Sequence, residues 1–165
     1  MSAGRPVALG LALALAGCVG PAGDVAPPPQ AAALPHGAFV LASDRAASML
    51  EQCSRSVPAA GEAGWTPGAA DIGALEALLP ARLSDKRPDR DWSGFPDRWI
   101  RQYVGIVRGG RRYIYGNFVP ADVADEAPGA DREAIIICDG GPAFFGAEYD
   151  VSARAITHLA FNGRA

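Results

Sequence analysis

The sequence predicts an α+β domain in which one or two N-terminal helices pack on a four- to five-stranded antiparallel meander sheet. Apolar side chains recur at helical spacing in the first half of the chain, and β-branched and aromatic runs fill much of the second half. Between two of those runs stand Gly109 and Gly110, a pair that is typical of a tight hairpin turn.

Two helices are expected before the main strands. Residues 42–54 place apolar side chains three and four positions apart, and Ser43 or Asp44 is a suitable N-cap. Residues 69–83 form a second amphipathic segment, in which Pro80 is expected to end or kink the helix because proline lacks the backbone N–H. The apolar face of this segment consists of Ile72, Leu75, Leu78 and Leu79.

The strands follow a long loop, residues 84–99, which mixes charge, proline and tryptophan without a period. Residues 99–108 and 111–119 are predicted to form a hairpin, because both central positions of its two-residue turn need a positive φ. In this register one face of the sheet carries four side chains, those of Val104, Ile106, Tyr113 and Tyr115.

Further strands are expected in the last third of the chain. Residues 134–138 (AIIIC) are continuously apolar, which is typical of a strand buried on both faces. Residues 144–151 and 155–161 are predicted to form a second hairpin around the turn 152–154, after the chain turns at residues 140–142 (GGP).

The N-terminus has the pattern of an export signal. One charged residue, Arg5, precedes an apolar run at residues 7–16, which is shorter than the roughly 20 residues that a membrane-spanning helix needs. Residues 15–18 (LAGC) resemble the lipobox of bacterial lipoproteins. The resemblance implies that a signal peptide, residues 1–17, is removed and that the thiol of Cys18 receives a diacylglyceryl group.

The lipobox also implies a cellular location for the protein. Two or three acyl chains hold a protein on a membrane, since each buried CH₂ contributes about 0.8 kcal/mol, so a lipid-anchored protein of the cell envelope is expected. An aspartate after the lipidated cysteine favours the inner membrane in such proteins; Val19 stands there, which favours the periplasmic side of the outer membrane. Residues 18–37, rich in proline and alanine, are predicted to be a tether, and residues 38–165 have the length of one domain.

Composition excludes some functions. The chain carries 15 basic and 18 acidic side chains, a formal net charge of −3, and a mildly acidic protein is a poor candidate for nucleic-acid binding. The domain's one histidine and two distant cysteines lack the spacing of metal ligands, so neither a metal nor a cofactor is expected.

The cysteine count predicts a disulfide. If the lipobox cysteine is acylated, Cys53 and Cys138 remain, in an oxidising compartment that favours their pairing. Such a bond would join the first helix to a central strand. The alternative is a catalytic nucleophile at Cys138, with His158 as its base and Asp139 or Asp150 orienting the imidazole.

Three arginines at the tip of the first hairpin are candidate partner-binding residues: Arg108, Arg111 and Arg112. Arg108 faces Arg111 across the turn, and like charges directly opposite each other are destabilising unless water or an anion relieves them. The site would suit phosphate headgroups or carboxylates. The alternative is a solvated turn that blunts a sheet edge.

Aromatic and acidic side chains supply further candidates. Trp92 and Trp99, with Phe95 between them, would form an exposed platform for a protein or glycan, or alternatively would lock the loop onto the core. Glu148 and Asp150 alternate on one strand face, an arrangement that would allow paired acids for glycoside hydrolysis.

The domain resembles an uncharacterised family of small proteobacterial envelope lipoproteins. The blocks that carry the resemblance are QCSR, WTP, DIGALEALLP, RQYVGIVRGGRRYIYGNF, CDGGPAFFGAEYD and HLAFNG. The family brings no known activity. With the anchor and the tether, the expected function is a non-enzymatic binding or accessory module whose partner is the membrane and another envelope protein or peptidoglycan. The alternatives are a small periplasmic hydrolase and an inhibitor of wall-degrading enzymes.

Overall fold

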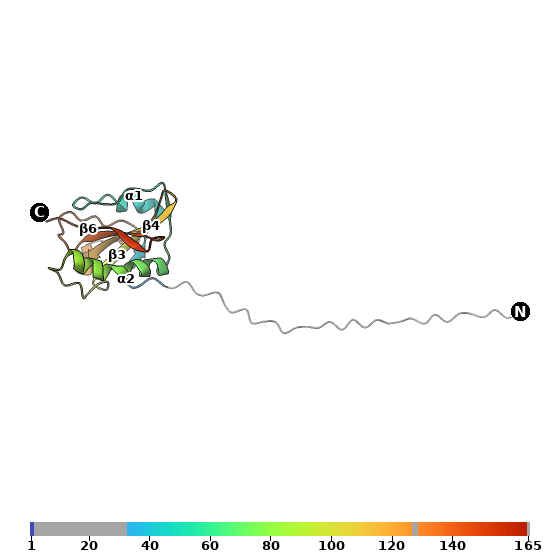
Figure 1. Ribbon diagram of the computed structural model, residues 1–165, viewed down its shortest axis with the longest axis horizontal. Helices are drawn as coiled ribbons and strands as arrows, with labels where there is room; N and C mark the ends of the chain where they lie inside the picture. The colour runs from blue at the N-terminus through green and yellow to red at the C-terminus, as the bar shows by residue number, and fades with distance from the viewer. Residues whose placement is uncertain (2–32, 127–128, 165) are drawn as a thin grey trace. The chain divides into compact units, whose positions relative to one another are not determined.

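The computed structural model describes Met1, residues 33–126 and residues 129–164. Residues 2–17 of the predicted signal peptide, Cys18 and residues 19–32 of the predicted tether lie outside these residues. The described part confirms the α+β class, with one sheet of six strands, mostly antiparallel, and few helices (Figure 1). Within it, no helix combines the length and the apolar character that crossing a membrane requires.

The elements follow one another as β1 (Ala38–Val40), η1 (Ser43–Arg45), α1 (Ala46–Met49), β2 (Ala63–Trp65), α2 (Ala69–Lys86), β3 (Trp99–Arg108), β4 (Arg111–Pro120), η2 (Ala121–Glu126), β5 (Phe145–Asp150) and β6 (Ala155–Phe161). The sheet order is β1-β3-β4-β5-β6, and β2 also pairs with β3. Strands β3 to β6 form the antiparallel meander that the sequence predicts.

The other edge of the sheet differs from the prediction. Strand β1 pairs with β3 in parallel, with Ala38 opposite Arg101, and β2 pairs with it antiparallel, with Ala63 opposite Val107. Each of these strands has three residues, too few to show a period of two. They form because β3 is ten residues long and leaves one edge open to both of them.

The β3–β4 hairpin is confirmed. Arg108 pairs with Arg111 at its end, and the two residues between them, Gly109 and Gly110, have φ of 59° and 71°. Residues with side chains rarely adopt this region, so the diglycine sets both the turn and the register. The β5–β6 hairpin also lies where the sequence predicts it, with a register shift between Glu148 and Tyr149.

Helix α2 covers one face of the sheet (Figure 1). Its buried side chains contact an aromatic layer in which Phe118 and Phe145 stack with ring centroids 4.4 Å apart. A buried ion pair also ties the helix to β3, since Arg101 Nε lies 2.8 Å from Glu76 Oε1. The residues that α2 buries are Ile72, Leu75, Leu79 and Leu83.

Pro80 lies inside α2. The sequence analysis expected this proline to end or kink the helix, and it does not end it. An interior proline costs about 3 kcal/mol because one backbone hydrogen bond is lost and its ring crowds the preceding turn. Leu79 and Leu83, on either side of it, are fully buried, and each buried leucine contributes roughly 2 kcal/mol. Packing therefore keeps the helix continuous to Lys86.

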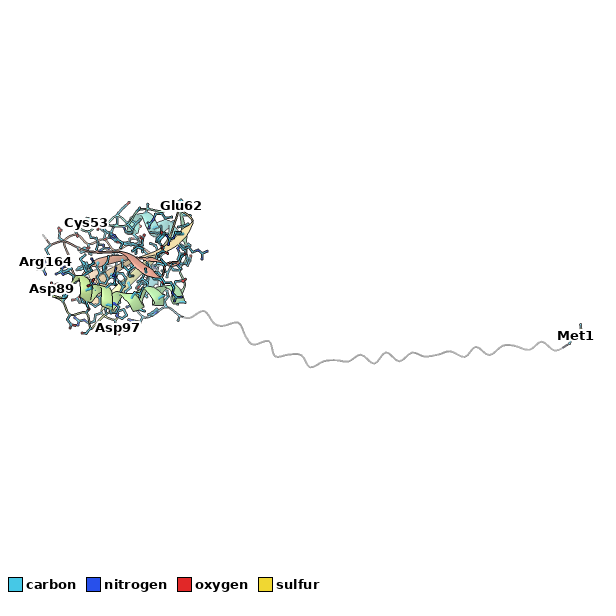
Figure 2. All side chains as sticks on the ribbon, viewed as in Figure 1. Met1, Cys53, Glu62, Asp89, Asp97 and Arg164 are labelled. Atoms are coloured by element: carbon cyan, nitrogen blue, oxygen red, sulfur yellow. A yellow bond between two sulfur atoms is a disulfide. The ribbon has the colours of Figure 1, made fainter. Side chains whose placement is uncertain are left out.

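The opposite face is covered by irregular chain, and side chains fill the space on both sides of the sheet (Figure 2). The helix predicted at residues 42–54 is shorter, a 3-10 turn followed by the four residues of α1. Met49 is the only buried residue of α1, so the helix has little packing to extend it. As predicted, Val104, Ile106, Tyr113 and Tyr115 share this face.

The strand predicted at residues 134–138 is absent, which is a correction. Ile135 is buried but Ile136 is 42% exposed, so the segment does not lie between two covered faces. It crosses over the sheet, where side-chain amides take the place of a strand ladder. Gln102 Oε1 accepts a hydrogen bond from Ile135 N at 2.8 Å, and Asn117 Nδ2 donates one to Ile135 O at 2.8 Å.

Candidate functional site

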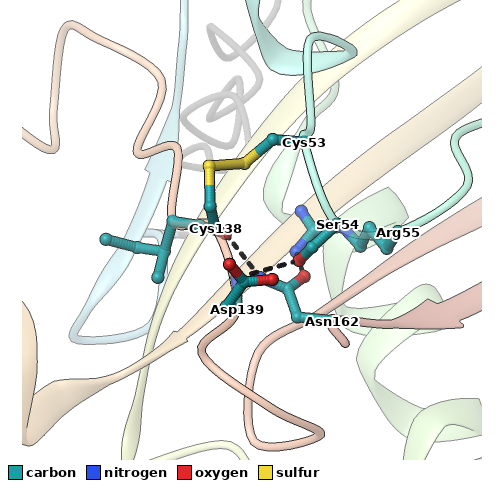
Figure 3. Close-up of a disulfide and its surroundings, with 7 residues drawn as sticks. Cys53, Ser54, Arg55, Cys138, Asp139 and Asn162 are labelled. Atoms are coloured by element: carbon teal, nitrogen blue, oxygen red, sulfur yellow. Dashed lines mark hydrogen bonds between the residues drawn. A yellow bond between two sulfur atoms is a disulfide. The ribbon is translucent and has the colours of Figure 1, made fainter. Parts of the chain in front are cut away.

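Cys53 and Cys138 form a disulfide, as the cysteine count predicts (Figure 3). Their Cα atoms are 5.4 Å apart, and 85 positions separate them in the sequence. The bond joins the loop after α1 to the segment before β5, and not a helix to a central strand as expected. Beside it, Asp139 N donates a hydrogen bond to Ser54 Oγ at 3.2 Å.

Next to the disulfide lies a buried arginine that the sequence analysis missed. Arg55 donates to Asn162 Oδ1 at 2.7 Å and to Asn117 Oδ1 at 2.5 Å, and its Nε lies 3.4 Å from the hydroxyl of Tyr115. Burial raises the pKa of the Tyr115 phenol, and the charge of Arg55 offsets part of that rise. These hydrogen bonds connect the loop after α1 to β4 and to the C-terminal segment, so the role of Arg55 is structural.

The disulfide contradicts the nucleophile hypothesis for Cys138, because a bonded sulfur is not a thiolate. His158, its expected base, is half-buried on β6, as the sequence suggested, and its Nε2 lies 3.0 Å from Ser56 O. The Asp150 carboxylate, one of the expected orienting groups, accepts hydrogen bonds from Ser152 N at 2.9 Å and from the next backbone N–H. The three groups therefore do not form a catalytic unit.

Two of the three hairpin arginines, Arg108 and Arg111, are neutralised by carboxylates of the protein itself. Arg108 Nη2 binds both carboxylate oxygens of Glu148, at 2.8 and 2.9 Å, and its guanidinium lies 4.2 Å from the ring centroid of Tyr113. Partial burial alone would lower the pKa of Arg108, but the bonds to Glu148 raise it above its ordinary value. Arg111 forms an ion pair with Asp150, in which its Nη2 lies 2.5 Å from one carboxylate oxygen, Oδ2.

These ion pairs also decide the role of the two strand acids. Glu148 and Asp150 lie on one face, as predicted, and both are almost fully buried. Each faces an arginine, and Thr157 Oγ1 donates a further bond to Glu148 at 2.8 Å. Both oxygens of Glu148 contact Arg108. One oxygen of Asp150 contacts Arg111 and the other accepts backbone hydrogen bonds, so neither acid has a carboxylate oxygen left for a substrate. The pair therefore stabilises the sheet and does not suit hydrolysis.

The predicted aromatic platform is wrong. Trp92 and Trp99 are each 6% exposed, and Phe95 is buried with them against Phe145. Their polar groups are satisfied internally, since Trp99 Nε1 donates to Ala143 O at 2.9 Å and Trp92 Nε1 to a carbonyl of its own loop. These rings lock the loop of residues 87–98 onto the sheet, the alternative that the sequence left open.

Arg112 remains exposed at the hairpin, and its guanidinium lies 5.1 Å from the ring centroid of Trp65 on β2. Of the three arginines it is the one for which no ion pair forms among the described residues. The prediction of a partner contact at the tip therefore rests on Arg112 alone.

Surface hollows offer places for a ligand or partner. One of about 490 Å³, beside the start of β3, has charged walls that include Arg90, Asp97 and Arg98. Two others lie between α2 and β6, with volumes of about 280 and 350 Å³, and share Arg82 and Ile156 in their walls. Across the described ranges, no group of three or more histidine, cysteine or carboxylate side chains could hold a metal ion.

No family model, no curated protein and no solved structure matches this chain.

Proposed function

We propose that the protein is a lipid-anchored lipoprotein of the cell envelope, held on the periplasmic side of the outer membrane, whose domain is a non-enzymatic binding or accessory module. The observation that carries the proposal is the Cys53–Cys138 disulfide. Disulfides persist in oxidising compartments such as the periplasm and are rare where thiols are kept reduced. The bond therefore supports export, which the signal-like N-terminus and the lipobox suggest independently.

A binding role accounts for the side chains better than hydrolysis does. The cysteine and the two strand acids that would serve a hydrolase are committed to a disulfide and to arginines. The sheet is covered on both faces, which leaves its edges and the surface hollows as places for contact. Another envelope protein or peptidoglycan is the proposed partner.

Metabolic labelling with a fatty acid tests the anchor. Label should appear on the wild-type chain and be lost in Cys18→Ala, whereas Cys53→Ser should keep it. Thiol titration of the mature chain should find no reactive thiol before reduction and two after it. Label that persists in Cys18→Ala, or a stoichiometric free thiol before reduction, would falsify the proposal.

A further inference from the structure

The outer edge of β6 is open. Strand β6 ends the sheet order and pairs only with β5, so among the described residues no strand lies on its other side. About half of the backbone N–H and C=O groups of such a strand point away from the sheet. Its sequence, AITHLAF, contains no proline and no lysine, residues that proteins commonly use to block an edge. The one irregularity in its pairing with β5 is the register shift at Glu148 and Tyr149, which leaves residues 158–161 in regular pairing. The edge can therefore accept another strand.

A groove runs beside this edge. The two hollows between α2 and β6 share Arg82 and Ile156, and so they adjoin each other. Leu78 of α2 is 38% exposed there, and Ala81 and Ala155 complete a small apolar floor. In Figure 1, β6 is drawn above α2, and residue contacts between the two elements show that they lie side by side.

The rim of the groove is basic. Arg82, Lys86 and Arg154 are exposed and line the hollows, and His158 lies at one end. None of the three cations forms an ion pair within the part of the chain that the structure describes, and no acidic side chain lines either hollow. The chain as a whole is acidic, so this surface stands out by the sign of its charge.

We propose that the α2–β6 groove binds an extended acidic segment of a partner polypeptide, which adds to the sheet as a strand beside β6. The edge supplies main-chain hydrogen bonds, the floor receives apolar side chains, and the cations of α2 bind carboxylates on the same face of the added strand. A second copy of this chain does not fit, because pairing β6 with β6 would bring Arg82, Lys86 and Arg154 of both copies together. The proposal rests on the binding role proposed above and not on the lipid anchor.

The test uses the full mature chain in detergent and a labelled seven-residue peptide, the length of β6, in which one strand face carries both valine and glutamate. Fluorescence anisotropy should show saturable binding that weakens as salt is raised. The double variant Arg82→Glu with Lys86→Glu should weaken binding by about tenfold or more, since attraction becomes repulsion at two positions. The matched control, Arg45→Glu with Arg132→Glu, changes the net charge equally at exposed sites elsewhere and should change affinity by less than about twofold.

A second probe separates strand addition from plain charge attraction. The same peptide with alternate backbone nitrogens methylated keeps every carboxylate but loses main-chain donors, and it should bind about tenfold more weakly. Equal binding of the methylated peptide overturns the proposal, as does the absence of binding at about 1 mM peptide. If the double reversal instead weakens binding to phosphatidylglycerol vesicles and leaves peptide binding unchanged, the groove is a membrane contact and the proposal is wrong. None of these outcomes bears on fatty-acid labelling at Cys18, so that experiment tests the lipid anchor separately.

Discussion

Loss of the Cys53–Cys138 disulfide should lower stability by a predictable amount. The bond spans 85 positions of the sequence, and in the chain-entropy treatment a loop of that length corresponds to about 4.5 kcal/mol at 25 °C. The stabilisation comes mainly from restricting the unfolded chain. Cys53→Ser and Cys138→Ser remove the same bond, so each should reduce the free energy of unfolding by several kcal/mol and by a similar amount. Both positions are exposed, so serine itself adds little.

Urea denaturation measures this loss of unfolding free energy. It is applied to the two single variants, the double variant and the reduced wild type. The double variant should resemble either single variant, because one bond can be lost only once. Reduced wild type is the matched control and should give the same midpoint. The dependence of unfolding free energy on urea should also steepen, since an unfolded chain without the cross-link exposes more surface.

Two results would refute this reasoning. One is a large loss for Cys138→Ser with almost none for Cys53→Ser, which would mean that the two sulfurs act separately. The other is a wild-type midpoint that does not move on reduction.

Three further perturbations test the interior. Arg108→Ala should cost about 2 kcal/mol in chemical denaturation, because it leaves the Glu148 carboxylate buried without its counterion, whereas Arg112→Ala should change stability by less than about 0.5 kcal/mol. Trp92→Ala should cost about 3 to 5 kcal/mol; a ring that served only as a surface platform would leave the thermal midpoint unchanged. Burial, and then the charge of Glu76, hold the pKa of Tyr103 well above its usual value. The folded protein therefore keeps this proton above about pH 10 while the unfolded chain releases it, so stability should fall as pH rises through that range, and less so in Tyr103→Phe.

The amino-acid sequence by itself determined the features whose signals are local. The diglycine and the alternating runs on either side of it specify the β3–β4 hairpin, since turn geometry and a period of two are properties of neighbouring residues. The helical spacing correctly placed Ile72, Leu75 and Leu79 on the buried face of α2. Leu78, predicted to share that face, is 38% exposed instead. The disulfide followed from the cysteine count once Cys18 was assigned to the lipobox and the domain to an oxidising compartment, an inference that needs no geometry.

Tertiary structure alone decided the features that depend on distant partners. The short strands β1 and β2 exist because the long strand β3 offers them an edge, and residues 134–138 lie over the sheet because amides from other strands bind their backbone. For the same reason, the structural roles of Trp92, Arg108 and the two strand acids differ from the binding and catalytic roles that the sequence offered for them. Burial and charge pairing are set by side chains tens of positions away, and no local pattern records which of them will meet.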